Sequence, residues 1–185
     1  MKIYTKKGDS GETGLYGGER VSKDNQRIHT YVTLDELNAV LGLLRARDSE
    51  ELPVVLSERL YRLQNELFQV GSELATPRGK TTTMALIGEG PITKMETEID
   101  SMESELSPLQ AFILPGGTKT SALLHFARTV SRRAERELIT LNRAEPVRAE
   151  LLRYLNRLSD YLFVCARYAN LKSKVKDVPW VAPKA

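Results

Sequence analysis

Leucines recur through the first half of the chain at the spacing of a long helix that packs inside a bundle. Their steps alternate between four and three residues, and one valine completes the series: Leu56, Leu60, Leu63, Leu67, Val70 and Leu74. This alternation keeps one side of a helix apolar over its whole length. Because such a stripe must be covered, the rest of the chain has to supply further helices of similar length.

Four other segments carry helical signals. Residues 33–36 and 93–96 both have the Thr-x-x-Glu form of a capping box, so we expect one helix to begin at Thr33 and another at Thr93. A long helix is expected from about Thr118 to Leu141, and a last one after Pro146. Residues 78–91 have no sustained period and many helix breakers, which predicts a loop.

These segments predict an all-α fold, a five-helix up-and-down bundle with short connections and no alternating strand pattern. The 185 residues suit a single domain. It divides into an N-terminal segment over residues 1–29, the bundle over 33–171, and a tail over 172–185 that packs back on the bundle. Phe112 lies in an apolar connection, residues 108–117, and its plainest role is to fill the end of the bundle.

Composition excludes several classes of protein. The 27 Lys and Arg residues against 24 Asp and Glu give only +3, so we expect no nucleic-acid partner. No segment reaches the apolar length needed to span a membrane, and the start has no apolar signal-peptide region. Cys165 is the single cysteine, which fits a reducing, cytoplasmic setting. With only His29 and His125, no Glu-x-x-His and no cysteine pair, no zinc or di-iron site is expected.

The long helix after Thr118 has one side rich in guanidinium groups. At about 100° per residue, Arg128, Arg132 and Glu135 fall within about 60° of one another, with Arg136 at their edge. We call these four residues the arginine face. The opposite side carries Phe126, Val130, Ala134 and Leu141. Arginine forks suit phosphate or carboxylate, although a solvated surface with ion pairs one turn apart is the commoner meaning of such a pattern.

The last helix divides in the same way. Asn156 and Asp160, one turn apart, lie opposite a stripe formed by Val147, Leu151, Leu155, Leu158, Leu162 and Cys165. Polar groups on both of the final helices are therefore predicted to stay outside the core.

Residues 5–18, TKKGDSGETGLYGG, hold five glycines and form a loop that lets backbone N–H groups approach a ligand closely. The loop matches neither the P-loop motif nor the G-x-G-x-x-G motif. Cationic and hydroxyl groups accompany the glycines: Thr5, Lys6, Lys7, Thr13 and, shortly after, Lys23. A phosphate cradle and a plain flexible loop both remain open at this point.

Five stretches together resemble the PduO-type ATP:cob(I)alamin adenosyltransferases and cover nearly the whole chain in order. They are TKKGDSGETGL, TLDELNAVLG, ELFQVGSELATP, FILPGGTKTSALLHFARTVSRRAER and LNRLSDYLFVCARYAN. The resemblance implies transfer of the 5′-deoxyadenosyl group of ATP to the cobalt of cob(I)alamin or a related corrinoid, with release of triphosphate. It also implies a homotrimer of five-helix bundles in which two neighbouring subunits share each site.

The resemblance assigns roles to individual positions. It implies that ATP binds with Mg²⁺ bridging its phosphates, in a triphosphate cradle formed by Thr5, Lys6, Lys7, Gly8, Thr13, Gly14 and Lys23. It also implies a second ATP-binding segment, which is formed by Arg132, Arg133, Glu135 and Arg136. Asn156 is implied to contact the adenosine. Arg132 is expected to stabilise the leaving group. Asp35 and Arg128 match an ion pair across the subunit interface, and Phe112 matches an aromatic beneath the corrin ring.

Three places depart from the family pattern and bear on corrin specificity: Val32, the run Asp24-Asn25-Gln26-Arg27, and Gln69. Two other classes of function stay open. The chain could be a non-catalytic regulator that responds to ATP or a corrinoid, or a helical interaction module whose arginines are a surface feature. A reductase is a possible partner for the enzyme.

Overall fold

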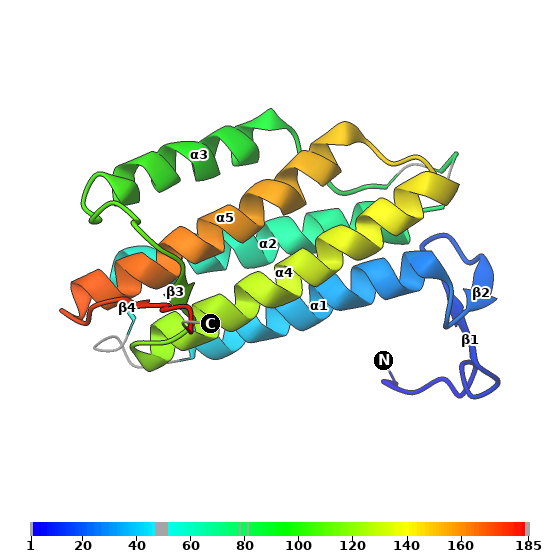
Figure 1. Cartoon of the computed structure of the whole chain (residues 1–185). Coiled ribbons are helices and arrows are strands. Elements are labelled where there is room, and N and C mark those ends of the chain that lie inside the picture. The colour runs from blue at the N-terminus through cyan, green and yellow to red at the C-terminus, as the bar shows by residue number, and fades with distance from the viewer. Residues whose placement is uncertain (1, 47–51, 78, 81, 184–185) are drawn as a thin grey trace.

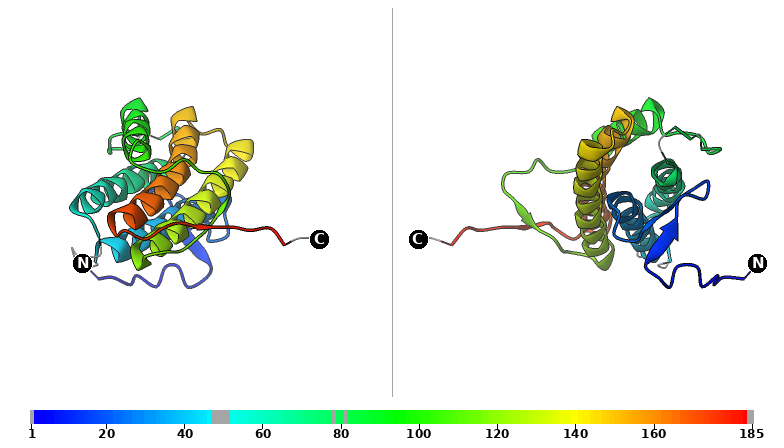
Figure 2. Two further views of the ribbon diagram at one scale, coloured as in Figure 1. Left: turned by 60° about the vertical axis from the view of Figure 1, so that its left-hand side comes forward. Right: turned by 90° about the vertical axis from the view of Figure 1, so that its right-hand side faces the viewer.

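The structure is a computed structural model that describes residues 2–46, 52–77, 79–80 and 82–183. Its five helices are α1 (Gln26–Arg45), α2 (Val54–Ala75), α3 (Glu89–Glu103), α4 (Lys119–Ala144) and α5 (Ala149–Lys172). Helices α1, α2, α4 and α5 form an elongated bundle, and α3 lies along the outer side of α5 (Figures 1 and 2). The predicted five-helix bundle is confirmed.

Two of the predicted helix starts are wrong. Helix α1 begins at Gln26, where Asn25 caps it by accepting a hydrogen bond from the Arg27 N–H at 2.9 Å. Thr33 lies inside this helix, and its hydroxyl donates to the carbonyl of His29 at 2.7 Å. Thr93 likewise lies inside α3, which follows Gly88. A threonine can bond the carbonyl four residues earlier within a helix, so the capping-box pattern also occurs in helix interiors.

The start of α4 agrees with the prediction. The Thr118 hydroxyl accepts a hydrogen bond from the Ser121 N–H at 3.0 Å and so caps the helix. The last helix also follows Pro146, as expected, with Arg148 as its N-cap. The loop predicted over residues 78–91 ends earlier than expected because α3 already begins at Glu89; positions 78 and 81 of that loop lie outside the described residues.

The described residues also form four short strands, which the sequence did not predict. Strand β1 (Glu12–Gly14) pairs antiparallel with β2 (Arg20–Ser22), and β3 (Ile113–Leu114) pairs antiparallel with β4 (Val178–Pro179). Strands of two or three residues are too short to show a period in the sequence. The second pair shows that the C-terminal tail lies against the connection between α3 and α4.

The core lies between the four bundle helices. The whole predicted leucine series of α2 is at most 2% exposed. Phe126 is a correction: we expected it on the apolar side of α4, but it is 49% exposed. The buried face of α4 is instead made by Leu124, Ala127, Val130, Ala134, Leu138 and Leu141. Phe126 lies at the edge of this stripe, and alanines on the buried side let α4 approach its neighbours closely.

Arg27 joins three helices at one end of the bundle. This buried side chain, 7% exposed, donates to the carbonyls of Leu74 at 2.8 Å and Thr76 at 3.4 Å, and forms an ion pair with Glu145. The last carbonyls of a helix have no partner within the helix, so Arg27 satisfies the end of α2. It thereby connects the start of α1, the end of α2 and the end of α4.

Within the described part of the chain, no helix combines the length and the apolarity that crossing a bilayer requires.

We predict that Arg27→Ala lowers the free energy of unfolding by about 2 kcal/mol, because buried carbonyls lose their donor. Urea unfolding followed by circular dichroism at one fixed protein concentration measures this change. Arg20→Ala is the control, since Arg20 is exposed and its loss should change stability by less than about 0.5 kcal/mol. Equal unfolding midpoints for the two variants would contradict the role given to Arg27.

Candidate functional site

The exposed side of α4 carries guanidinium groups that its own chain does not neutralise. Arg132 and Arg136 are exposed, and neither forms an ion pair among the described residues. Arg128 is half-buried, and its Nε atom has no hydrogen-bond partner in the same part of the chain. Burial, followed by the nearby charge of Arg132, lowers the pKa of Arg128. The arrangement therefore favours a negatively charged ligand over this face.

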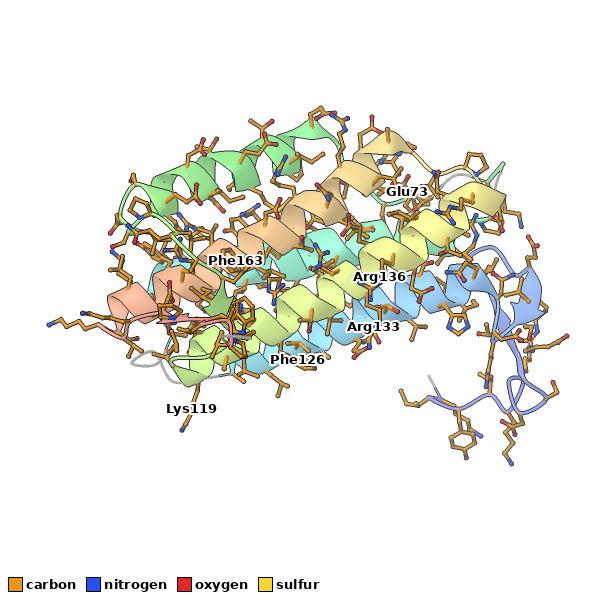
Figure 3. The ribbon with its side chains drawn as sticks, viewed as in Figure 1. Glu73, Lys119, Phe126, Arg133, Arg136 and Phe163 are labelled. Atoms are coloured by element: carbon orange, nitrogen blue, oxygen red, sulfur yellow. The ribbon has the colours of Figure 1, made fainter. Side chains whose placement is uncertain are left out.

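Not every arginine on α4 is free to bind a negatively charged ligand. Arg133 forms an ion pair with Glu36 of α1 and so links two helices of the bundle. Figure 3 shows Arg133 and Arg136 within one turn of each other on α4, with Arg133 beside α1. The interpretation of the arginines as ordinary surface ion pairs fits Arg133, whereas it does not describe Arg128, Arg132 or Arg136.

Two predicted ATP contacts on neighbouring helices meet directly. The side-chain amide of Asn156 on α5 donates to the carboxylate of Glu135 on α4 at 2.9 Å. The other polar residue predicted on that side of α5, Asp160, is exposed and accepts from Arg157 at 3.0 Å. Through Glu135, the arginine face on α4 is thus joined to Asn156 on α5.

The N-terminal segment forms a tight turn ahead of the β1–β2 hairpin. The Gly11 N–H donates to the carbonyl of Gly8 at 3.2 Å, and the Lys23 N–H donates to the carbonyl of Gly11 at 2.9 Å. The ammonium of Lys23 lies so close to Gly8 that a Cβ on the glycine would be 3.4 Å from it. Lys6 has a positive φ of 59°. The turn therefore gathers Gly8 and Lys23, while Thr5, Lys6 and Lys7 are exposed beside it.

A single chain does not bring this segment onto the arginine face. No hydrogen bond or ion pair joins residues 5–23 to residues 128–136 in the part of the chain that the structure describes. The right-hand view of Figure 2 places the N-terminal segment on the far side of α1 from α4. The two halves of the predicted ATP site are thus apart within one subunit.

Asp35 and Arg128 are also not paired within the chain. Asp35 is exposed on α1 and forms no ion pair among the described residues. Its neighbour Glu36, by contrast, reaches Arg133. An ion pair between Asp35 and Arg128 would therefore have to involve a second subunit, as the resemblance implies.

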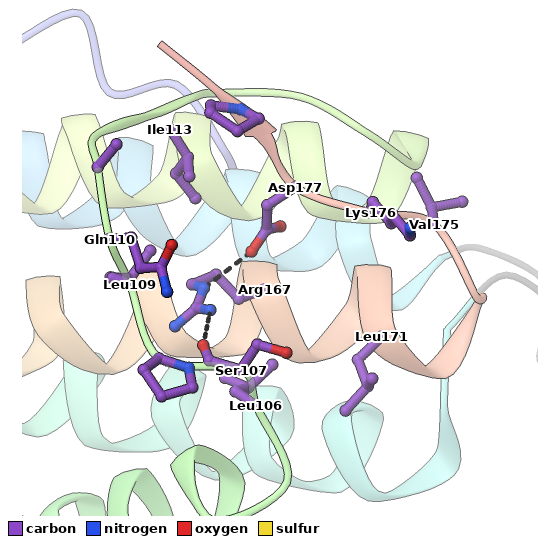
Figure 4. A pocket seen from close by; sticks show the side chains of 13 residues that line it. Leu106, Ser107, Leu109, Gln110, Ile113, Arg167, Leu171, Val175, Lys176 and Asp177 are labelled. Carbon is purple, nitrogen blue, oxygen red and sulfur yellow. Dashed lines mark hydrogen bonds and ion pairs between the residues drawn. The ribbon is translucent and has the colours of Figure 1, made fainter.

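Phe112 does not fill the end of the bundle, and that interpretation is wrong. Its side chain is 81% exposed. It stands just before β3, where side chains alternate between two faces, so that Ile113 and Phe112 point in opposite directions. Ile113 lines a cavity of about 600 Å³ between the connection 106–111, the end of α5 and the tail (Figure 4). Phe112 is thus presented outward from a short ribbon.

Sequence reasoning missed the polar side chains behind this ribbon. Arg167, Asn170 and Asp177 form a hydrogen-bonded cluster that connects α5 to the tail. Arg167 and Asn170 are only 6% and 2% exposed. Their spacing of three residues on one helix face was the available signal, but both lie in a stretch of α5 that is otherwise apolar.

His125 is buried next to Arg128 and was considered in the sequence only as a metal ligand. It is 2% exposed, and neither ring nitrogen has a hydrogen-bond partner among the described residues. Its ring meets Phe163 edge-on at 5.8 Å between centroids. Burial, followed by the charge of Arg128, lowers the pKa of His125, while Asp177 opposes this shift. The imidazole is therefore neutral near pH 7.

Comparison with known proteins identifies the family and the fold. The family model described as cobalamin adenosyltransferase matches residues 3–169. The corrinoid adenosyltransferase of Bacillus subtilis is 44% identical over 181 residues, which cover 97% of this chain and 92% of that protein. The mouse corrinoid adenosyltransferase MMAB is 44% identical over 175 residues, covering 92% of this chain and 73% of its own length.

A solved structure of a corrinoid adenosyltransferase also matches this chain closely. A variant of the PduO-type ATP:corrinoid adenosyltransferase from Lactobacillus reuteri, complexed with cobalamin and ATP, is 38% identical and superposes with a TM-score of 0.92. The match covers 97% of this chain and 99% of that one.

The chain therefore belongs to the cobalamin adenosyltransferase family. Within it, the chain is an enzyme of the PduO type, and its activity is that of an ATP:corrinoid adenosyltransferase. The resemblance stated from the sequence is confirmed, and the interpretations as a regulator or as an interaction module are set aside.

We predict that the stability of the protein falls with pH below about 6.5, the ordinary pKa of histidine, partly because of His125. The unfolded chain takes up a proton there while the folded imidazole stays neutral, so protonation favours the unfolded state. Denaturant unfolding at about pH 5 and about pH 8 should show a smaller loss of stability on acidification in His125→Gln than in the parent. The same substitution at exposed His29 controls for removing an imidazole, and an unchanged pH dependence in His125→Gln would contradict the prediction.

Proposed function

We propose that adenosyl transfer takes place at a site shared by two subunits of a homotrimer, where the N-terminal segment of one closes on the arginine face of the next. The observation that carries this proposal is the separation of the two predicted halves of the ATP site within one chain. Both halves are rich in cationic groups that face solvent. A neighbouring subunit is the simplest source of the missing half.

Exposed apolar side chains support an interface on α1 and α4. Val32 and Leu43 on α1 are 51% and 61% exposed, and Phe126 on α4 is 49% exposed. Large apolar groups at the surface of adjacent helices are typical of a face that another protein covers. The exposed Asp35 lies on the same α1 helix, and we propose that it pairs there with Arg128 of the neighbouring subunit.

The N-terminal segment has the groups that a triphosphate requires. Lys6, Lys7 and Lys23 supply positive charge. The hydroxyls of Thr5 and Thr13 supply neutral donors, and the backbone at Gly8 and Gly14 can approach phosphate oxygens closely. A side chain at Gly8 would lie 3.2 Å from the carbonyl of Glu12 and crowd Lys23. The turn thus depends on a glycine where a phosphate would sit.

The arginine face takes the other side of the nucleotide. We assign Arg132 to the leaving triphosphate, because its guanidinium is exposed and unpaired among the described residues. Arg136 extends the charge along α4, and Arg133 joins it in binding ATP only when it exchanges Glu36 for a phosphate. The hydrogen-bonded pair Glu135 and Asn156 offers both acceptors and a donor, which suits the polar edges of adenosine.

The substrates supply the reactive groups: a cobalt–carbon bond to C5′ forms as the C5′–oxygen bond breaks, and triphosphate leaves with the electron pair of that bond. Because the reduced corrinoid is itself the nucleophile, no side chain has to attack or to remove a proton. The residues of this chain hold C5′ in line with the metal and stabilise the charge that grows on the leaving oxygen. Arginines, lysines and backbone N–H groups are suited to both tasks.

Phe112 has the position that the corrin side of the reaction needs. An apolar ring held outward, 81% exposed, can lie beneath a corrin and exclude both water and the lower axial base. We propose that it leaves cobalt(II) four-coordinate and so makes reduction to cobalt(I) accessible. The neutral His125 and the half-buried Arg128 lie on the part of α4 that follows the ribbon bearing Phe112.

The remaining partners follow from the same chemistry. The described residues gather no group of three His, Cys, Asp or Glu that could hold a metal ion, so we propose that Mg²⁺ enters with the phosphates of ATP. A reductase that delivers an electron to cobalt(II) is the partner this reaction calls for. We place the enzyme in the cytoplasm, where the buried free thiol of Cys165 stays reduced.

We predict that Arg132→Ala lowers turnover about a hundredfold, because one donor to the developing negative charge is lost. An anaerobic assay with reduced cob(I)alamin, ATP and Mg²⁺ measures the rate, and mass spectrometry identifies adenosylcobalamin and triphosphate. Arg153→Ala is the matched control, since Arg153 is an exposed arginine on α5 that pairs with Glu89 of α3. Parent-like turnover in Arg132→Ala would remove its assignment to the leaving group.

A further inference from the structure

The ribbon that carries Phe112 is held by its backbone and not by its own side chain. Phe112 is 81% exposed and lies in no aromatic pair in the described part of the chain. Its carbonyl accepts a hydrogen bond from the Trp180 N–H at 2.7 Å. The ring can therefore keep one position only if the tail that holds this carbonyl is itself fixed.

Asp177 fixes the tail directly before β4. One of its carboxylate oxygens accepts from the Nε of Arg167 at 2.8 Å, and the other accepts from the amide of Asn170 at 3.0 Å. Arg167 and Asn170 lie one turn apart on α5, so both oxygens are bound to the same rigid helix (Figure 4 shows the Arg167 contact). The tail then continues straight into Val178–Pro179, which pairs with β3.

Asn170 also fixes the end of the connection that follows Phe112. Its side-chain oxygen accepts from the Thr118 N–H at 3.0 Å, and its NH₂ group donates to the carbonyl of Gly116 at 3.2 Å. Because Thr118 N–H can only donate and the Gly116 carbonyl can only accept, these partners determine which way the amide faces. Gly117, with φ of 98°, makes the approach possible, since a Cβ there would lie 2.3 Å from Asn170.

Arg167 fixes the other end of the connection between α3 and α4. Its second contact is a hydrogen bond from Nη2 to the carbonyl of Ser107 at 2.7 Å, just before the connection begins. The connection is thus held at both ends by α5 and in its middle by the tail. All three attachments lead to one cluster, which is formed by the buried Arg167 and Asn170 and the partly buried Asp177.

We propose that Asp177, Asn170 and Arg167 are positioning residues that set Phe112 beneath the corrin ring through the ribbon of β3 and β4. This inference rests on the role proposed above for Phe112. None of the three side chains needs to touch a substrate. They determine how completely the lower axial ligand is displaced, and therefore how much cobalt(II) becomes four-coordinate.

Two substitutions test the positioning role without removing a side chain from the hydrophobic core. Asp177→Asn keeps the size of the side chain but leaves one NH₂ group facing a donor of either Arg167 or Asn170. Trp180→Pro removes the N–H that binds the Phe112 carbonyl and leaves the buried cluster intact. Glu105→Gln is the matched control, because it makes the same carboxylate-to-amide change in the exposed ion pair with Lys172 at the same end of α5.

Electron paramagnetic resonance of cob(II)alamin bound with Mg²⁺ and ATP gives the readout. The four-coordinate signal should fall about tenfold in Asp177→Asn and in Trp180→Pro, because a small displacement of the ring readmits an axial ligand. ATP affinity measured by calorimetry should stay within about twofold of the parent, since no ATP contact changes. Turnover of pre-reduced cob(I)alamin should be retained, because that substrate needs no ligand displaced, and Glu105→Gln should match the parent throughout.

Phe112→Ala is measured in the same experiment. It separates the positioning role of the cluster from the role of Phe112 beneath the corrin, on which the positioning role rests. A parent-like four-coordinate signal in both positioning variants, together with its loss in Phe112→Ala, would overturn the positioning role alone. A parent-like signal in Phe112→Ala would overturn the proposed function of Phe112 itself. A parallel loss of ATP affinity in the positioning variants would also overturn the proposal, because the damage would then not be specific to the corrin side.

Discussion

The guanidinium groups of Arg128, Arg132 and Arg136 on α4 form no ion pair among the described residues. Arg128 and Arg132 lie close enough that the second lowers the pKa of the first, and neither Arg132 nor Arg136 pairs with a carboxylate among the described residues. Such a face is costly until an anion covers it. We propose that the triphosphate of ATP is that anion, and that the same charges stabilise the leaving group during transfer.

Helix α4 also places the residues proposed for the two substrates along one axis. It begins at the turn clamped by Asn170, beside the ribbon of Phe112, continues past His125 and Arg128, and reaches Arg132 and Arg136 further on. In the proposed site, the corrin side therefore lies toward the start of the helix and the phosphate side toward its middle. At about 1.5 Å per residue, the helix sets the spacing between them without any flexible part.

The sequence predicted those parts of the structure that repeat along a helix. The leucine series of α2, the division of α4 into a core side and an arginine face, and the start of α4 near Thr118 all follow from local spacing. The starts placed at Thr33 and Thr93 were wrong because a threonine also fits inside a helix, where the Thr33 hydroxyl donates to the carbonyl of His29. The cluster of Asn170 and Asp177 could not be predicted, since it depends on where the tail meets a connection far away in the chain.

Subunit mixing tests the shared site most directly. One subunit would carry Lys7→Ala with Lys23→Ala, and the other Arg132→Ala; each alone should be inactive. If the site takes its N-terminal segment and its arginine face from different subunits, random mixing in a closed ring restores about a quarter of the parent activity. If both halves come from one chain, no mixed assembly contains an intact site, and activity that stays at the level of the two variants would contradict the account.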